Sequence, residues 1–125
     1  MELIIGGAYQ GKLEYAAEKY GFKEAEIYSC TEENGMSFDK PCVQAVEEFV
    51  MYCLKRGLNA IEILEENRDK WKNSVFICRE IFSGVVPMDV LLRKWRDETG
   101  RVLTYLSGQA DTVTRLFCGI PQKLK

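Results

Sequence analysis

The 125-residue chain carries 17 basic and 19 acidic residues, a formal net charge of -2, and no histidine. The near balance of charge gives no long-range attraction to nucleic acid or to an anionic membrane surface, so any anion site must be local. The absence of imidazole excludes mechanisms in which this chain supplies a histidine base, nucleophile or metal ligand. The length fits one domain over residues 1–125, with a core that needs no disulfides.

The five cysteines are odd in number and scattered, without a C-x-x-C pair. This pattern favours neither a disulfide framework nor a zinc site. No apolar run approaches the ~20 residues of a membrane span, and the first residues show a strand pattern rather than a signal peptide. We therefore expect a cytoplasmic protein with no protein-held metal cluster, and with neither nucleic acid nor membrane among its partners.

The first part of the chain predicts a strand, a glycine loop and a helix. Residues 1–5 form a short apolar run, and glycines follow it at once. Residues 12–20 are rich in helix formers with one apolar face, and Gly21 stands where a helix C-cap belongs. Residues 25–30 are a second strand candidate, followed by a polar loop.

The middle of the chain predicts two helices and a strand. Apolar residues recur at helical spacing between Pro41 and Gly57, which predicts an amphipathic helix beginning at Pro41. Asn59 followed by Glu62 resembles a capping box and predicts a short helix that ends near residue 67. Residues 74–78 then read as a buried strand.

The last part of the chain predicts a long helix over residues 88–106 and a final strand over residues 113–118. The helix has an apolar face made by Met88, Leu91, Leu92, Trp95, Val102, Leu103 and Leu106. Strands alternate with helices along the whole chain, which predicts a three-layer α/β domain with a mainly parallel sheet of about four strands. Numbering the predicted strands along the chain, we expect the sheet order 2-3-1-4.

The glycine loop after the first strand fits the phosphate-binding pattern G-x-x-x-x-G-K-[ST] up to its last position. In such a P-loop, glycines let backbone N–H groups surround phosphate oxygens, and lysine adds a mobile charge. A strand before the loop and a helix after it complete the required context. The sequence thus predicts a P-loop nucleotide-binding fold that binds GTP or ATP through Gly6, Gly7, Ala8, Tyr9, Gln10, Gly11, Lys12 and Leu13.

Leu13 stands at the position of the loop hydroxyl that normally coordinates Mg²⁺. A leucine side chain offers no ligand, so Mg²⁺ would need other ligands or water. Metal-assisted phosphoryl transfer depends on that ion, whereas nucleotide binding does not depend on it to the same degree. The substitution therefore affects chemistry more than binding.

The stretch REIFSGVVPMDVLLRKWRDETGR resembles the adenosylcobinamide kinase / adenosylcobinamide-phosphate guanylyltransferase family of cobalamin biosynthesis. Members carry an acidic residue, a glycine-rich V-P turn and then a helix of the form R-x-[FW]-R-D-x-x-G-R. Two further stretches fit, a G-G-A-x-x-G-K loop and an AD-strand-G ending before a final LK. The matching residues are Gly6, Gly7, Ala8, Gly11, Lys12, Glu80, Gly84, Val86, Pro87, Arg93, Trp95, Arg96, Asp97, Gly100, Arg101, Ala110, Asp111, Gly119, Leu124 and Lys125.

This resemblance implies a kinase that passes a phosphoryl group from a nucleoside triphosphate to the aminopropanol hydroxyl of adenosylcobinamide, and an assembly of three copies. Two departures bear on the chemistry. The region between residues 20 and 74 is shorter than in the family, and the chain has no histidine to form the guanylyl-histidine intermediate. We therefore expect the guanylyltransferase step to be lost, while Leu13 removes the loop hydroxyl that normally serves the kinase step.

Four residues are the candidates for chemistry outside the loop backbone. Lys12 would contact nucleotide phosphates, and Glu80, at the tip of a predicted strand, would assist transfer or hold Mg²⁺ through water. Alternatively, Glu80 makes a structural ion pair with Arg93 or Arg96. These two arginines would bind phosphate or substrate in a planar, bidentate way, or else form a charged outer face.

Three functions remain open at the level of sequence. The first is a cobinamide kinase-like enzyme that uses Lys12 and Glu80. The second is a non-catalytic nucleotide or corrinoid binding protein, with a regulatory role, that kept the phosphate loop and lost the metal ligand. The third is a structural partner subunit whose loop is a relic.

Overall fold

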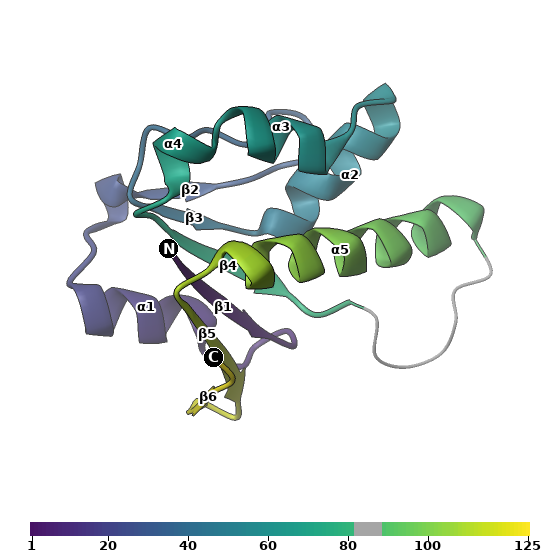
Figure 1. Ribbon diagram of the computed structural model, residues 1–125. Helices are drawn as coiled ribbons and strands as arrows, with labels where there is room; N and C mark the ends of the chain where they lie inside the picture. Colours follow the sequence, from purple (N-terminus) through teal and green to yellow (C-terminus); the bar gives the residue numbers. More distant parts are fainter. Residues whose placement is uncertain (82–88) are drawn as a thin grey trace.

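A computed structural model describes residues 1–81 and 89–125. Within these residues, strands and helices alternate along the chain and six strands form one sheet in the order β2-β3-β4-β1-β5-β6. The strands are β1 (Glu2–Gly6), β2 (Ile27–Ser29), β3 (Cys42–Gln44), β4 (Val75–Arg79), β5 (Thr112–Phe117) and β6 (Ile120–Lys123). The helices are α1 (Lys12–Tyr20), α2 (Val46–Arg56), α3 (Ala60–Glu66), α4 (Arg68–Trp71) and α5 (Val90–Gln109), with a short 3₁₀ turn at Glu24–Glu26. Figure 1 shows this arrangement.

The sheet is parallel except at one edge. β1 lies at its centre between β4 and β5, and β2 and β3 extend the parallel part on the β4 side. β6 pairs antiparallel with β5 through a tight hairpin. The carboxyl ends of β1, β3, β4 and β5 therefore meet at one edge of the sheet, where α/β proteins gather their ligands.

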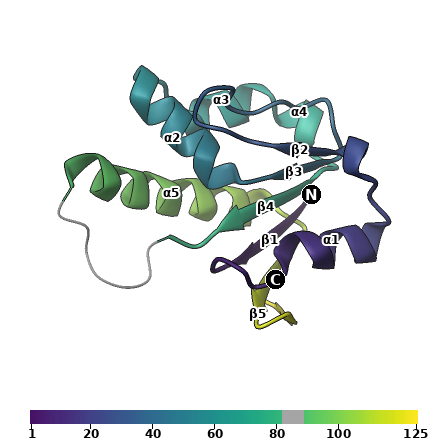
Figure 2. The same cartoon turned by 180° about the vertical axis from the view of Figure 1, so that it is seen from behind.

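Helices cover both faces of the sheet, as the α/β prediction requires (Figures 1 and 2). Alternate residues of β1 and β4 point to opposite faces: Leu3 and Phe76 join the core under α2 and α5, whereas Ile4 and Ile77 join the core under α1. These side chains are at most 2% exposed. Burial on both faces explains why these strands read as continuous apolar runs.

The predicted helices are confirmed over most of their length. Residues 12–20 form α1, and Gly21 caps it with a positive φ of 69°. The side chain of Asn59 caps α3 by accepting a hydrogen bond from the amide of Glu62 at 3.1 Å. α5 follows the predicted long helix, although its first apolar residues are exposed: Val90, Leu91 and Leu92.

The prediction that a helix begins at Pro41 is wrong. Cys42–Gln44 forms β3, and α2 begins at Val46. Cys42 and Val43 are fully buried because β3 lies between β2 and β4, where both faces of the strand are covered. A buried strand followed at once by a helix leaves no break in the apolar pattern, so the two elements merged into one predicted helix.

The strand count of about four was too low, but the relative order of the four predicted strands is confirmed. In the structure β3 separates the second predicted strand from the third, and β6 adds an antiparallel edge after the strand predicted to be last. All four residues of β6 are exposed, so the segment lacks the buried alternation that would have identified it.

Candidate functional site

A pocket of about 380 Å³ opens at the carboxyl edge of the sheet, where β1 and β4 lie side by side. β1 leads into α1 on one face of the sheet, whereas its neighbour β4 is followed by α5 on the opposite face. Such a change of face between neighbouring strands creates a crevice, and ligands of open α/β sheets bind there. The lining comes from the glycine loop, the start of α1, the turn into α2 and the end of β4: Ala8, Tyr9, Gln10, Gly11, Lys12, Leu13, Glu14, Gln44, Ala45, Glu47, Ile77 and Arg79.

Two glycines of the loop are required by the structure, Gly6 by close packing and Gly11 by its backbone conformation. A Cβ atom on Gly6 would lie 2.7 Å from the carbonyl oxygen of Leu116, which is too close for any side chain. Gly11 has a φ of 84°, in the left-handed region that favours glycine, and it directly precedes α1. The loop therefore turns sharply away from β1 and brings the N-terminus of α1 to the pocket.

Backbone strain is concentrated around this pocket. In the described part of the chain, the non-glycine residues with positive φ are Tyr9 at 59°, Ala45 at 59° and Cys118 at 50°. Tyr9 and Ala45 line the pocket, and the amide of Cys118 donates to the side chain of Gln10, another lining residue. Each such conformation costs about 1–2 kcal/mol, and strain of this kind gathers at functional sites.

Lys12 extends from the first turn of α1 into the pocket. Its Nζ donates to the carbonyl oxygen of Gly7 at 2.6 Å, so the ammonium lies over the loop that precedes it. Burial lowers the pKa of Lys12, while the negative charge of Glu47 partly opposes that change. A cation whose charged form is disfavoured in this way gains stabilisation when an anion approaches it.

Arg79, at the end of β4, brings a second cation to the pocket. Its guanidinium lies 5.9 Å from the centre of the Trp95 ring, which is a cation–π distance. The Trp95 indole in turn donates to the carbonyl oxygen of Glu47 at 2.7 Å, which fixes the ring. Arg79 was not a candidate in the sequence analysis.

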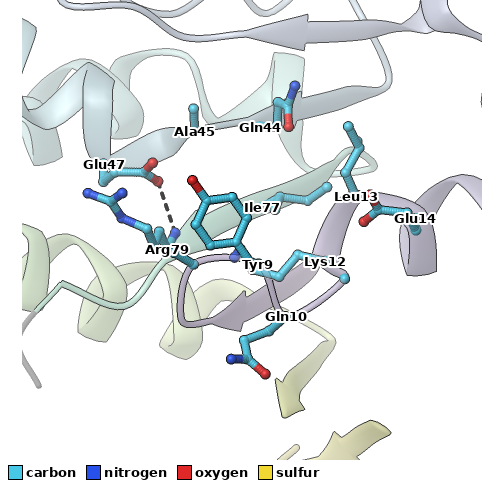
Figure 3. Close-up of a pocket in the computed structure, with 12 residues that line it drawn as sticks. Tyr9, Gln10, Lys12, Leu13, Glu14, Gln44, Ala45, Glu47, Ile77 and Arg79 are labelled. Carbon is cyan, nitrogen blue, oxygen red and sulfur yellow. Dashed lines mark hydrogen bonds between the residues drawn. The ribbon is translucent and has the colours of Figure 1, made fainter. Parts of the chain in front are cut away.

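Glu47 is the buried carboxylate of the site, and Figure 3 shows it beside Arg79. Its residue is 7% exposed, and its Oε1 accepts the backbone N–H of Arg79 at 2.9 Å, drawn there as a dashed line. This bond ties the first turn of α2 to the end of β4. Glu47 was missed because the strand before it was predicted as part of a helix, which hid its position just past a strand end.

Glu80 lies outside this pocket. Its carboxylate forms an ion pair with Arg115 of β5, with Oε1 3.1 Å from Nε and Oε2 3.2 Å from Nη2. The predicted alternative of a structural ion pair is therefore correct in kind, but its partner is neither Arg93 nor Arg96. Glu80 lies beside Ile5 and the α5 residues Leu103 and Thr104, outside the lining of the Lys12 pocket.

The predicted arginines of the long helix are also not among the lining residues. Arg93 is exposed on α5, and Arg96 pairs with its neighbour Asp97 at 3.2 Å. Trp95 packs against the core, as expected. The motif positions Gly84, Val86 and Pro87 and the first helix residue of the prediction, Met88, lie outside the described residues.

The donors around the pocket do not suit Mg²⁺. Leu13 occupies the hydroxyl position, Glu14 is exposed on α1, and Glu47 already accepts the Arg79 amide. Within residues 1–81 and 89–125, no group of three or more Cys, Asp or Glu side chains is arranged to hold a metal ion. At phosphate sites Mg²⁺ takes waters, phosphate oxygens and one or two protein oxygens, and the P-loop hydroxyl that usually supplies one of these is replaced here by Leu13.

Fold and site together define a three-layer α/β protein with a cation-lined pocket at the carboxyl edge of its parallel strands. The sequence model of the cobinamide kinase / cobinamide phosphate guanyltransferase family matches residues 53–124. The chain belongs to that family. No curated protein matches the chain, and among the described residues no helix is long and apolar enough to cross a membrane.

Proposed function

We propose that the chain binds a nucleoside triphosphate, GTP or ATP, in this pocket and acts as a cobinamide kinase in cobalamin biosynthesis or salvage. The observation that carries the proposal is that Lys12 and Arg79 both reach the pocket behind the glycine loop. Neither cation forms an ion pair with a carboxylate of the described residues. Two cations without such an ion pair, beside backbone N–H groups, suit the phosphates of a nucleotide.

The proposed reaction is an in-line phosphoryl transfer. A hydroxyl oxygen of cobinamide attacks the terminal phosphorus, and a P–O bond forms while the bond to the bridging oxygen breaks. The nucleoside diphosphate leaves with that oxygen, and the hydroxyl proton passes to a carboxylate or to water. Lys12 and Arg79 stabilise negative charge on the phosphate oxygens, and Glu47 is the buried carboxylate in their pocket.

The guanylyltransferase step has no support in this chain. A covalent guanylyl-histidine needs an imidazole, and the sequence contains none. We therefore propose that the chain performs at most the kinase half of the activities in the family description. Assembly of several copies, which the family resemblance implies, stays an expectation.

A non-catalytic nucleotide or corrinoid binding protein is the second candidate. The observation that favours it is the position of Glu80, whose carboxylate pairs with Arg115 and does not line the Lys12 pocket. Leu13 also favours a non-catalytic protein, because it replaces the loop hydroxyl and the described residues form no cluster of metal ligands in its place. Such a protein would bind nucleotide and leave it unchanged.

The test combines binding with turnover. The full chain is titrated calorimetrically with GTP and with ATP, then incubated with the nucleotide labelled at its terminal phosphate and with adenosylcobinamide. Label on the corrinoid, lost in Lys12→Ala but kept in Lys72→Ala, is the result expected of a kinase. Binding without transfer supports the second candidate, and no binding at millimolar nucleotide overturns both.

A further inference from the structure

The two cations of the pocket are held by different parts of the fold. Lys12 comes from α1 on one face of the sheet, and among the described residues its Nζ forms one hydrogen bond, to the Gly7 carbonyl. Arg79 comes from the end of β4, and its guanidinium has no hydrogen-bond acceptor among the described residues. The Trp95 ring 5.9 Å away orients it. Both charges are thus available to one ligand between them.

The same pocket is poor in oxygen donors for a divalent cation. Leu13 replaces the loop hydroxyl, and Gln44, at the end of β3, carries no charge. One oxygen of Glu47 is engaged by the Arg79 amide at 2.9 Å. The lining therefore lacks the hydroxyl ligand of a metal-dependent P-loop, and its two carboxylates are the exposed Glu14 and the partly engaged Glu47.

We propose that this pocket binds the polyphosphate of its nucleotide free of any divalent cation, with Lys12 and Arg79 supplying the positive charge that Mg²⁺ would otherwise supply. The inference rests on the proposed nucleotide binding and specifies that the nucleotide is bound as the free polyphosphate anion rather than as its Mg²⁺ complex. The planar guanidinium bonds two phosphate oxygens at once, and the ammonium contributes a point charge from the opposite side.

Competition for the phosphates follows from this arrangement. Mg²⁺ in solution binds the same oxygens that Lys12 and Arg79 need, and the complex carries less negative charge than the free nucleotide. Because Leu13 offers the metal no ligand and one oxygen of Glu47 is already engaged, the pocket does not favour the Mg²⁺ complex, and Mg²⁺ lowers the fraction of nucleotide in the form that the pocket binds. Added Mg²⁺ should therefore weaken the observed affinity, the reverse of a metal-dependent P-loop.

The experiment is a calorimetric titration of the full chain with GTP and with ATP, once in EDTA and once in excess Mg²⁺. We expect tighter binding in EDTA, with at least a roughly threefold loss of affinity in Mg²⁺. Arg79→Ala and Arg79→Gln should each lose at least about tenfold in EDTA, the scale of a charged hydrogen bond. Arg68→Ala, an exposed arginine of α4, is the matched control and should change nothing.

The other outcomes of these titrations distinguish failure of the metal-free binding form from failure of nucleotide binding itself. Binding that needs Mg²⁺, or that tightens with it, overturns the metal-free form and leaves nucleotide binding standing. Unchanged affinity in both folded Arg79 variants also overturns it, since the charge would then come from elsewhere. Binding of neither nucleotide under either condition overturns this inference together with the proposed function.

Discussion

Lys12 makes the pocket sensitive to pH through its ammonium group. Burial lowers the pKa of Lys12 below its ordinary value, and bound phosphate would raise it again by favouring the charged form. Affinity for nucleotide should therefore be full below the lowered pKa and fall as pH rises through it. Titration with GTP in EDTA from about pH 7 to about pH 10 measures this decline.

Lys12→Arg is the control for that titration. An arginine stays charged throughout this range, so the variant should show a flatter pH dependence even if its affinity differs. A natural chain whose affinity stays constant to about pH 10 would contradict the role given to the ammonium.

At the level of residues, the sequence predicted Lys12, which belongs to a local motif. It missed Arg79 and Glu47, which reach the pocket only because of how the strands and helices pack. Lys12 follows glycines at a fixed spacing, so it could be found without the fold. Arg79 and Glu80 both stand at a strand end, but Arg79 lines the Lys12 pocket and Glu80 pairs with Arg115 of β5. Which of the two side chains enters the pocket depends on the residues that α5 and β5 bring to each, and local sequence does not encode this.

The β5–β6 hairpin braces the glycine loop. The amide of Cys118 donates to the side-chain oxygen of Gln10, and the amide of Gly119 donates to the Gln10 carbonyl at 3.1 Å. Gln10→Ala should remove the first bond, worth about 1 kcal/mol, and speed hydrogen exchange at the Cys118 amide about fivefold. Amide exchange followed by NMR measures this.

Gln10→Glu is the matched variant for the hairpin, because its carboxylate can still accept the Cys118 amide. It should retain slow exchange at that amide. Equal exchange rates in Gln10→Ala and the natural chain would show that the hairpin holds its position without this side chain.

At the level of elements, the errors in the prediction have physical causes. β3 was hidden because buried strand residues run directly into the apolar face of α2, with the turn made by Ala45 rather than by glycine or proline. β6 was hidden because its four residues are exposed. Helices with explicit stop and start signals, such as Gly21 after α1 and Asn59 before α3, could be predicted well.

Thr99 on α5 offers a way to stabilise the protein. Its residue is fully buried, and its hydroxyl has no hydrogen-bond partner among the described residues. Thr99→Val keeps the branched shape and removes the unsatisfied polar group, so the free energy of unfolding should rise by about 1 kcal/mol. Urea denaturation measures the change, and Thr104→Val, whose hydroxyl bonds the Gly100 carbonyl at 3.0 Å, is the comparison that should not gain stability.

On the scale of the whole molecule, the central strand β1 links two polar clusters at opposite edges of the sheet. Its carboxyl end carries the glycine loop, and its amino end carries Glu2, whose side chain is 4% exposed. The Glu2 carboxylate accepts hydrogen bonds from Lys19 at 3.0 Å and from the Thr114 hydroxyl at 2.8 Å. The Tyr20 hydroxyl also donates to this carboxylate. Glu2 thus joins α1 and β5 to β1.

This cluster should control acid stability. Burial alone would raise the pKa of Glu2, but the hydrogen bonds from Tyr20, Thr114 and Lys19 outweigh it and lower the pKa below 4.5. A carboxyl group with a lowered folded pKa stabilises the protein above its unfolded pKa, and this contribution is lost as pH falls through the folded value. Glu2→Gln should therefore cost about 1–3 kcal/mol at neutral pH and progressively less in acid.

Urea denaturation of the natural chain and Glu2→Gln at several pH values tests this, with Glu18→Gln, an exposed glutamate of α1, as control. A stability difference that stays constant into acid would contradict the assigned charge. Because Glu2 and the pocket lie at opposite ends of β1, Glu2→Gln should keep its nucleotide affinity wherever it remains folded. Loss of affinity in the folded variant would instead mean that the amino end of β1 controls the shape of the glycine loop.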